Sequence, residues 1–165
     1  MTPAQYSIRP VEPGEEAALF ALIVGLAEYE NLAHMVVATP PDLADALFGE
    51  KARVEAVLVR VDNHPEPVGF ALYYHNFSTF LGRAGLYLED LFVLPAFRGQ
   101  GLGRALLIHL ARLAVSRNCG RFEWSVLDWN TSAQGFYESL GARVLPDWRI
   151  TRVTGAALTA LAALP

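Results

Sequence analysis

The chain has 165 residues, of which 53% are hydrophobic, so it can bury a sizeable core and is too apolar to be disordered. Its net charge of −4 argues against nucleic acid as a partner, because phosphate binding needs a basic surface. No apolar run approaches the ~20 residues of a membrane span, and the first residues do not predict a signal peptide.

The first half of the chain predicts one strand, two helices and three further strands. The strand covers residues 5–10 and the first helix residues 13–28, where apolar side chains recur at helical spacing. A second helix at 39–49 is expected to be capped by Thr39 and ended by Gly49. Three segments rich in β-branched and aromatic residues then predict strands at 54–61, 67–77 and 85–95.

The third of these segments, GLYLEDLFVLP, is apolar on both of its alternations. One alternation carries Leu86, Leu88, Phe92 and Leu94, and the other carries Tyr87, Leu91 and Val93. A strand with this pattern is expected to be buried on both faces of its sheet.

Later segments predict a helix that ends near 117, a strand at 121–129, a short helix at 130–141 and a last strand at 148–153. In the short helix, Thr131 and Gln134 have the spacing of a capping box, and Gly141 is expected to end it. The alanine- and leucine-rich tail at 154–164 predicts a packed final helix. This order of elements predicts one domain over residues 1–165, with a mixed α/β sheet covered by helices on both faces.

Three glycines stand at alternate positions directly before a predicted helix, in the stretch AFRGQGLGRALL: Gly99, Gly101 and Gly103. The first turn of a helix has unpaired N–H groups and a partial positive charge, and glycine lets an anion approach them closely. The stretch is therefore either an ordinary glycine-rich turn or a phosphate-binding loop. It fits neither the dinucleotide-binding motif, whose third glycine would come one residue later, nor the P-loop, which needs a lysine.

The stretch does match R-x-x-G-x-G, with Arg98, Gly101 and Gly103, after a strand that ends YLEDLFVLPAF. This pattern is similar to the acetyl-CoA signature of the GNAT superfamily of N-acetyltransferases. The chain resembles most closely the spermidine/spermine (diamine) N-acetyltransferase branch, through IRP, LAEYE, VGFALYYHNFS, LYLEDLFV, RGQGLG, DWN and GFYESLGA. The resemblance implies a GNAT fold, whose central, mostly antiparallel twisted sheet has about six to seven strands.

The resemblance further implies that acetyl-CoA is the co-substrate and lies along two neighbouring, diverging strands. The backbone of Leu91, Phe92 and Val93 would pair with its pantetheine arm. Its pyrophosphate would lie on Arg98, Gly99, Gln100, Gly101, Leu102, Gly103 and Arg104. The expected contacts on the short helix are Asn130, Ala133, Phe136 and Tyr137. Asn130 is equally suited to cap that helix.

Two adjacent acids, Glu89 and Asp90, interrupt an otherwise apolar strand. Buried carboxylates cost several kcal/mol unless they are bonded, so the pair indicates either a structural salt bridge or a reactive site. An alkyl amine, with a pKa of ~10.4, must lose a proton before it can form an amide. The resemblance implies that Glu89 takes up this proton through water, and burial is expected to raise its pKa. Asp90 is expected to bind a second cationic nitrogen or to brace the strand.

The resemblance also implies that the Tyr137 hydroxyl protonates the departing thiolate, although position alone is typical of a boundary aromatic. Expected substrate contacts are Tyr29, Glu30, Glu89, Asp90, Glu123, Trp124 and Ser125. A charged helix end such as the one at Glu30 is also typical of solvated surface. The acceptor is then a small diamine or polyamine, or a related amino acid such as thialysine. The alternatives are an aminoglycoside, another amino acid or a protein N-terminus as acceptor, or a non-catalytic acyl-CoA-binding module.

The partners and the compartment follow from a few further residues. The four histidines are scattered without metal-ligand spacing, so no metal is expected. The single cysteine, Cys119, has no internal disulfide partner, which favours the cytoplasm. The branch works as a homodimer, and the apolar tail at 154–164 is suited either to that contact or to its own core.

Overall fold

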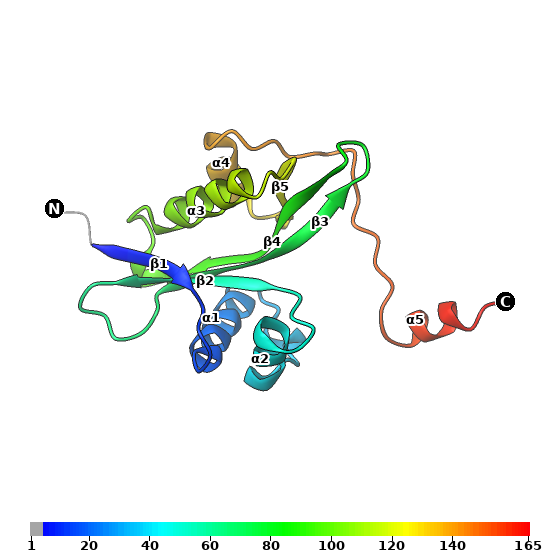
Figure 1. Cartoon of the computed structure of the whole chain (residues 1–165), viewed down its shortest axis with the longest axis horizontal. Coiled ribbons are helices and arrows are strands. Elements are labelled where there is room, and N and C mark those ends of the chain that lie inside the picture. Colours follow the sequence, from blue (N-terminus) through cyan, green and yellow to red (C-terminus); the bar gives the residue numbers. More distant parts are fainter. Residues whose placement is uncertain (1–4) are drawn as a thin grey trace. The chain divides into compact units, whose positions relative to one another are not determined.

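The computed structural model describes residues 5–165, which form two compact units, one up to Ser125 and one from Val126 onward. The first unit contains one five-stranded sheet with the order β1-β2-β3-β4-β5 (Figure 1). The strands are β1 (Tyr6–Pro10), β2 (Glu55–Val61), β3 (Gly69–Ser78), β4 (Arg83–Val93) and β5 (Arg121–Trp124). β1 to β4 are antiparallel neighbours, whereas β5 runs parallel to β4. The α/β class is confirmed, with five strands among the described residues instead of six to seven.

Helices cover both faces of this sheet, as predicted. α1 (Glu16–Tyr29) and α2 (Pro40–Phe48) lie on one face and α3 (Leu102–Ser116) on the other (Figure 1). Two short 3-10 helices, η1 (Ala33–Met35) and η2 (Pro95–Phe97), precede α2 and α3. The core under α1 is built from apolar side chains of the helix and of three strands: Leu19, Leu22, Leu26, Ala56, Leu58, Phe70, Leu72 and Phe92.

Local signals account for the ends of these helices. The N–H and the hydroxyl of Thr39 both donate to the Asp42 carboxylate at the start of α2, and Gly49 follows its last residue. The predicted cap and stop of α2 are therefore confirmed.

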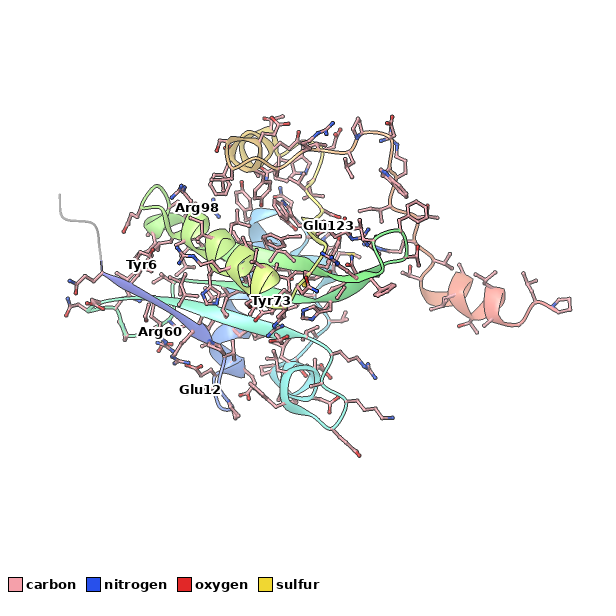
Figure 2. All side chains as sticks on the ribbon, turned by 45° about the horizontal axis from the view of Figure 1, so that its top comes forward. Tyr6, Glu12, Arg60, Tyr73, Arg98 and Glu123 are labelled. Carbon is pink, nitrogen blue, oxygen red and sulfur yellow. The ribbon has the colours of Figure 1, made fainter. Side chains whose placement is uncertain are left out.

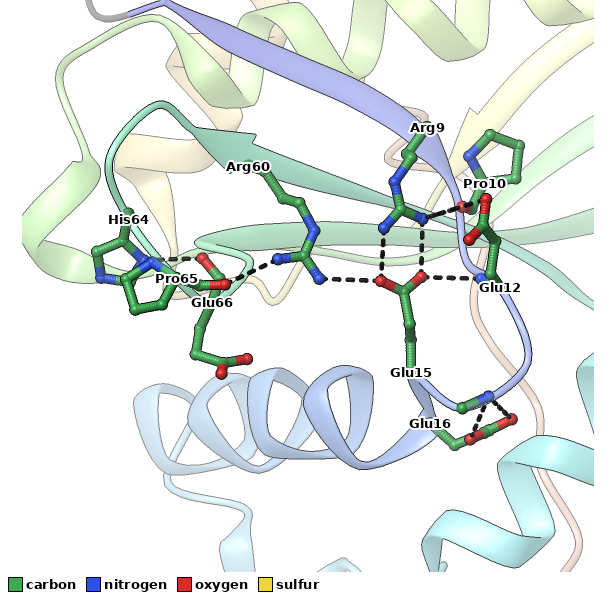
Figure 3. Close-up of polar contacts among 10 residues, drawn as sticks. Arg9, Pro10, Glu12, Glu15, Glu16, Arg60, His64, Pro65 and Glu66 are labelled. Atoms are coloured by element: carbon green, nitrogen blue, oxygen red, sulfur yellow. Dashed lines mark hydrogen bonds and ion pairs between the residues drawn. The ribbon is translucent and has the colours of Figure 1, made fainter.

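A network of arginine and glutamate side chains holds the start of α1 to β1 and β2 (Figure 3). The Glu15 carboxylate accepts hydrogen bonds from both terminal nitrogens of Arg9, at 2.8 and 2.6 Å, and from Arg60 at 2.9 Å. It also accepts one from the backbone N–H of Glu12. The hydrogen bonds from Arg9, above all, lower the pKa of Glu15 to about 2. The network thus fixes the beginning of the helix whose other end carries Tyr29.

A β-bulge interrupts β4 at Glu89. Leu88 and Asp90 pair with consecutive residues of β3, which leaves Glu89 as the extra residue. Side chains of a strand alternate between the two faces of the sheet, and beyond a bulge this alternation shifts by one residue. Leu86 and Leu88 therefore lie on the face covered by α3. Asp90 and Phe92 lie on the face covered by α1. The prediction that Phe92 shares a face with Leu86 and Leu88 is therefore wrong.

The second unit contains α4 (Thr131–Ser139) and α5 (Gly155–Ala162). The predicted final helix is found as α5, but its predicted packing is not, because all of its residues are exposed. The Asn130 side chain accepts from the N–H of Ala133 and so caps α4. The predicted capping box is wrong, because Gln134 donates its side-chain amide to the carbonyls of Leu127 and Asp128.

Two strand predictions differ from the structure. Residues 148–153 form no strand, because no strand of the described chain provides hydrogen-bond partners for them. The strand predicted at 121–129 ends at Trp124, where its pairing with β4 also ends. Among residues 5–165, no helix combines the length and the apolar character that crossing a membrane requires.

Candidate active site

The loop before α3 is shaped to receive an anion. Gly99 and Gly101 have positive φ angles of 74° and 82°, a conformation that favours glycine. A Cβ atom added to either residue would meet nothing within 4 Å, so the space above the loop is open. The N–H groups of residues 99–104 donate no hydrogen bond to any described part of the chain. These amides, at the positive end of α3, are therefore available to a phosphate.

Next to this loop, one edge of β4 is open. β4 pairs with β5 only along Gly85–Leu88, and no described strand pairs with that edge from Glu89 to Val93. The carbonyl of Phe92, expected to share the pantetheine contact, points toward Gly69 of β3. Since peptide groups alternate along a strand, those of Leu91 and Val93 point to the open edge. The edge can therefore pair with an extended, amide-containing ligand.

The bulge separates the two acids of β4. Glu89 is exposed, so its expected burial is not found. Asp90 is the partly buried acid, because it follows the extra residue and faces α1. Burial raises the pKa of Asp90 to about 6, and the negative charges of Glu89 and Glu30 contribute to the rise.

The residue after α1 adds a third carboxylate next to the two acids of β4. Glu30 directly follows α1, and burial raises its pKa. None of the ion pairs within residues 5–165 includes Glu30, Glu89 or Asp90, so the structural salt bridge considered for the two strand acids is not found there. These three residues, called the acidic cluster below, are suited to bind a cation.

Two tyrosines lie beside Glu89. Tyr74 and Tyr87 are cross-strand neighbours whose ring centroids are 5.2 Å apart, and the Tyr87 hydroxyl is 2.9 Å from the Ser125 hydroxyl. Burial raises the pKa of Tyr74, and the charge of Glu89 adds to this rise. Aromatic rings next to carboxylates favour the binding of organic cations.

The predicted substrate contacts on β5, Glu123 and Trp124, interact with neighbouring side chains of the sheet. Glu123, labelled in Figure 2, accepts a hydrogen bond of 2.8 Å from Asn76 and lies 3.1 Å from the Arg121 Nε. The Trp124 ring centroid is 4.9 Å from that of Phe122. No group of three or more His, Cys, Asp or Glu side chains in the described part of the chain could hold a metal ion.

A glycine loop with available amides, beside an open strand edge and an acidic cluster, agrees with the resemblance found in the sequence. The profile of the Acetyltransferase (GNAT) family matches residues 23–142. The chain belongs to this GNAT family. It is thus an acetyl-CoA-dependent N-acetyltransferase, and its relatives confirm the diamine acetyltransferase branch.

The relatives of this GNAT enzyme include acetyltransferases of small amines. The thialysine N-epsilon-acetyltransferase of Sus scrofa is 36% identical over 96% of this chain and 98% of that protein. L-ornithine N5-acetyltransferase NATA1 of Arabidopsis thaliana is 32% identical over 93% of this chain and 86% of that protein. Spermidine/spermine N(1)-acetyltransferase-like protein 1 of Homo sapiens is 32% identical over 83% of this chain and 20% of that protein.

A solved structure confirms the GNAT fold. The integron cassette protein VCH_CASS6 from the mobile metagenome of V. cholerae has a TM-score of 0.80 and 30% identity to this chain. The match covers 96% of this chain and 98% of that one.

The other residues that the resemblance implies belong to the second unit. Asn130, Ala133, Phe136 and Tyr137 lie at the start of α4 or within it. Asn130 acts as the helix cap, which leaves its expected contact with the coenzyme a prediction. The rings of Phe136 and Tyr137 are 5.4 Å apart. The role of Tyr137 as an acid also stays a prediction.

Sequence reasoning missed two features of this GNAT site. One is the contact between Tyr74 and Tyr87, for which tyrosines in two neighbouring predicted strands are a signal. The other is the bulge that turns Asp90 toward α1, which leaves no clear mark in a strand of apolar residues.

Proposed function

We propose that this GNAT enzyme acetylates a primary amine of a small diamine or polyamine, or of an amino acid with a terminal amine such as thialysine or ornithine. The acidic cluster carries the proposal, since its three carboxylates have no ion-pair partner within residues 5–165. An acceptor with two cationic nitrogens would match this charge. The names of the relatives, thialysine and L-ornithine acetyltransferases, support the same class of acceptor.

The coenzyme in this proposal is bound by backbone groups. The pyrophosphate accepts hydrogen bonds from the amides of residues 99–104, where the glycines leave open space. The pantetheine arm pairs with the Leu91 peptide group and the Val93 N–H along the open edge of β4, while the Val93 carbonyl accepts from Arg98. The acetyl end of the arm then comes to the part of β4 that carries Glu89.

The reaction is a direct transfer without an acyl-enzyme. Glu89 removes a proton from the ammonium group, directly or through a water, because its side chain is exposed at the bulge. The neutral nitrogen attacks the thioester carbonyl and the carbon–sulfur bond breaks. As the amide and the thiolate form, the nitrogen releases its second proton to solvent. Tyr137 donates its hydroxyl proton to that thiolate. Asp90 and Glu30 hold the second cation of the acceptor and so orient the reacting amine.

A matched pair of acceptors tests this assignment of the acidic cluster. We expect kcat/KM for 1,4-diaminobutane to exceed that for butylamine by about tenfold or more, since only the diamine can place a second cation at Asp90. Because the pKa of Asp90 is about 6, its carboxylate is charged above that pH. The diamine preference should therefore grow as the pH rises through 6, and Asp90→Asn should abolish both the preference and its pH dependence. Equal use of the two amines by the unmodified enzyme would contradict the proposed acceptor.

We also propose a cytoplasmic homodimer, with the C-terminal helix as part of the contact. In α5, Leu158 and Leu161 are each 54% exposed, which leaves apolar surface for a second copy of the chain. The single cysteine, Cys119, is free, which is compatible with a reducing compartment.

A further inference from the structure

We propose that Tyr29 is a positioning residue for the coenzyme loop and that it acts through Arg98. The inference rests on the proposed function, because it needs the loop at residues 99–104 to bind coenzyme A. It differs from the sequence-based expectation, in which Tyr29 contacts the amine and Arg98 contacts the coenzyme.

The geometry around Arg98 supplies the first observation. Arg98 directly precedes Gly99, on the segment between β4 and α3 (Figure 2). Its guanidinium carbon lies 4.4 Å from the centroid of the Tyr29 ring and 5.4 Å from that of Phe92. Its Nε donates a hydrogen bond of 2.9 Å to the carbonyl of Val93. The guanidinium therefore joins the start of the loop to the end of α1 and to β4.

The second observation is the freedom of the loop itself. Gly99 and Gly101 adopt left-handed conformations with open space around them, and the N–H groups of residues 99–104 donate no hydrogen bond to the described chain. The Gly101 carbonyl accepts from the N–H of Ala105, so the part of the loop before Gly101 is the least constrained. Ordering such a loop around a ligand costs conformational entropy. The contacts of the Arg98 guanidinium with two aromatic rings fix the residue before Gly99 already in the free protein. This lowers the entropic cost of binding the coenzyme.

Tyr29 is the part of this arrangement that comes from another element. It is the last residue of α1 and the neighbour of Glu30 in the acidic cluster. Phe92 and Val93, by contrast, belong to the same strand that leads into the loop. Tyr29 thus connects the coenzyme loop with the helix that supplies a carboxylate to the amine, and its ring is expected to affect coenzyme affinity without touching the coenzyme.

Calorimetric titration with coenzyme A, in the absence of any amine, tests the proposal. We expect Tyr29→Leu to weaken binding by about threefold to tenfold, because it removes the ring under Arg98. Tyr29→Phe keeps that ring and should bind nearly as the unmodified protein does. Arg98→Gln should also weaken binding, and adding Tyr29→Leu to it should cause little further loss, since the two residues act as a unit.

Three results would overturn the proposal, provided that thermal melting shows each variant to be folded. The first is unchanged affinity in Tyr29→Leu together with a changed KM for the amine, which would make Tyr29 an acceptor contact. The second is additive losses in the double variant, which would make Arg98 an independent phosphate ligand. The third is equal loss in Tyr29→Phe and Tyr29→Leu, which would assign the effect to the hydroxyl. If the unmodified protein does not bind coenzyme A, the proposed function itself fails, and this result is distinguishable from the other three.

Discussion

Replacing Glu89 with glutamine is expected to lower kcat by about 100-fold or more, because a positioned general base contributes roughly that factor. The amide has nearly the shape of the carboxylate but cannot take up the proton of the amine. Glu89 is exposed and is the extra residue of the bulge, so the substitution should leave folding and coenzyme affinity unchanged. Steady-state kinetics that follow the release of free thiol would measure the effect.

Glu66→Gln is the matched control for this experiment. It makes the same chemical change at an exposed glutamate between β2 and β3, and its kcat should equal that of the unmodified enzyme. Asp90→Asn tells the two strand acids apart. If turnover survives Glu89→Gln and is lost in Asp90→Asn at saturating amine, the base is Asp90, and the assignment of Glu89 is wrong.

Replacing Gly101 with alanine is expected to weaken coenzyme A binding by about tenfold to 100-fold. The φ angle of Gly101 is 82°, where an L side chain is strained by roughly 1–2 kcal/mol. The added methyl group would enter the open space above the loop, where the proposed pyrophosphate lies. The strain lowers the stability of the fold, whereas the methyl group obstructs the bound coenzyme, and titration calorimetry would measure the loss of affinity.

Gly82→Ala separates the strain from the lost phosphate contact. Gly82 also has a positive φ, 62°, and open space around its Cβ position, but it lies in the turn between β3 and β4. This variant should lose similar stability in a thermal melt and keep its full affinity for coenzyme A. Equal affinities for the two alanine variants would show that the loop does not hold the phosphates.

The parts of the site that depend on local chemistry could be predicted from the sequence. Glycines at alternate positions before a helix predict a loop with open amides, and Gly99 and Gly101 have the required positive φ angles. The caps of α2 are equally local, because Thr39 and Asp42 are three residues apart. The helices and most strands follow from apolar patterns that extend over whole elements, which is why the α/β class was predictable.

Features that depend on pairing between distant residues could not be predicted in this way. The bulge at Glu89 exists only in the register of β4 against β3, and it leaves Glu89 exposed and turns Asp90 toward α1. The contact between Arg98 and Tyr29 joins residues far apart in the chain. Residues 148–153 alternate like a strand, but a strand needs a partner, and none of the described strands pairs with them.

Thiol release from acetyl-CoA with a set of amine acceptors is the most direct test of the function proposed here. The set contains 1,4-diaminobutane, spermidine, thialysine, ornithine, an aminoglycoside and a peptide with a free N-terminus. We predict turnover with one or more of the first four and little with the other two, because the acidic cluster matches a small, multiply charged amine. Turnover confined to the aminoglycoside or the peptide would contradict this acceptor class. Binding of acetyl-CoA without turnover on any of them would contradict catalysis of this acetyl transfer.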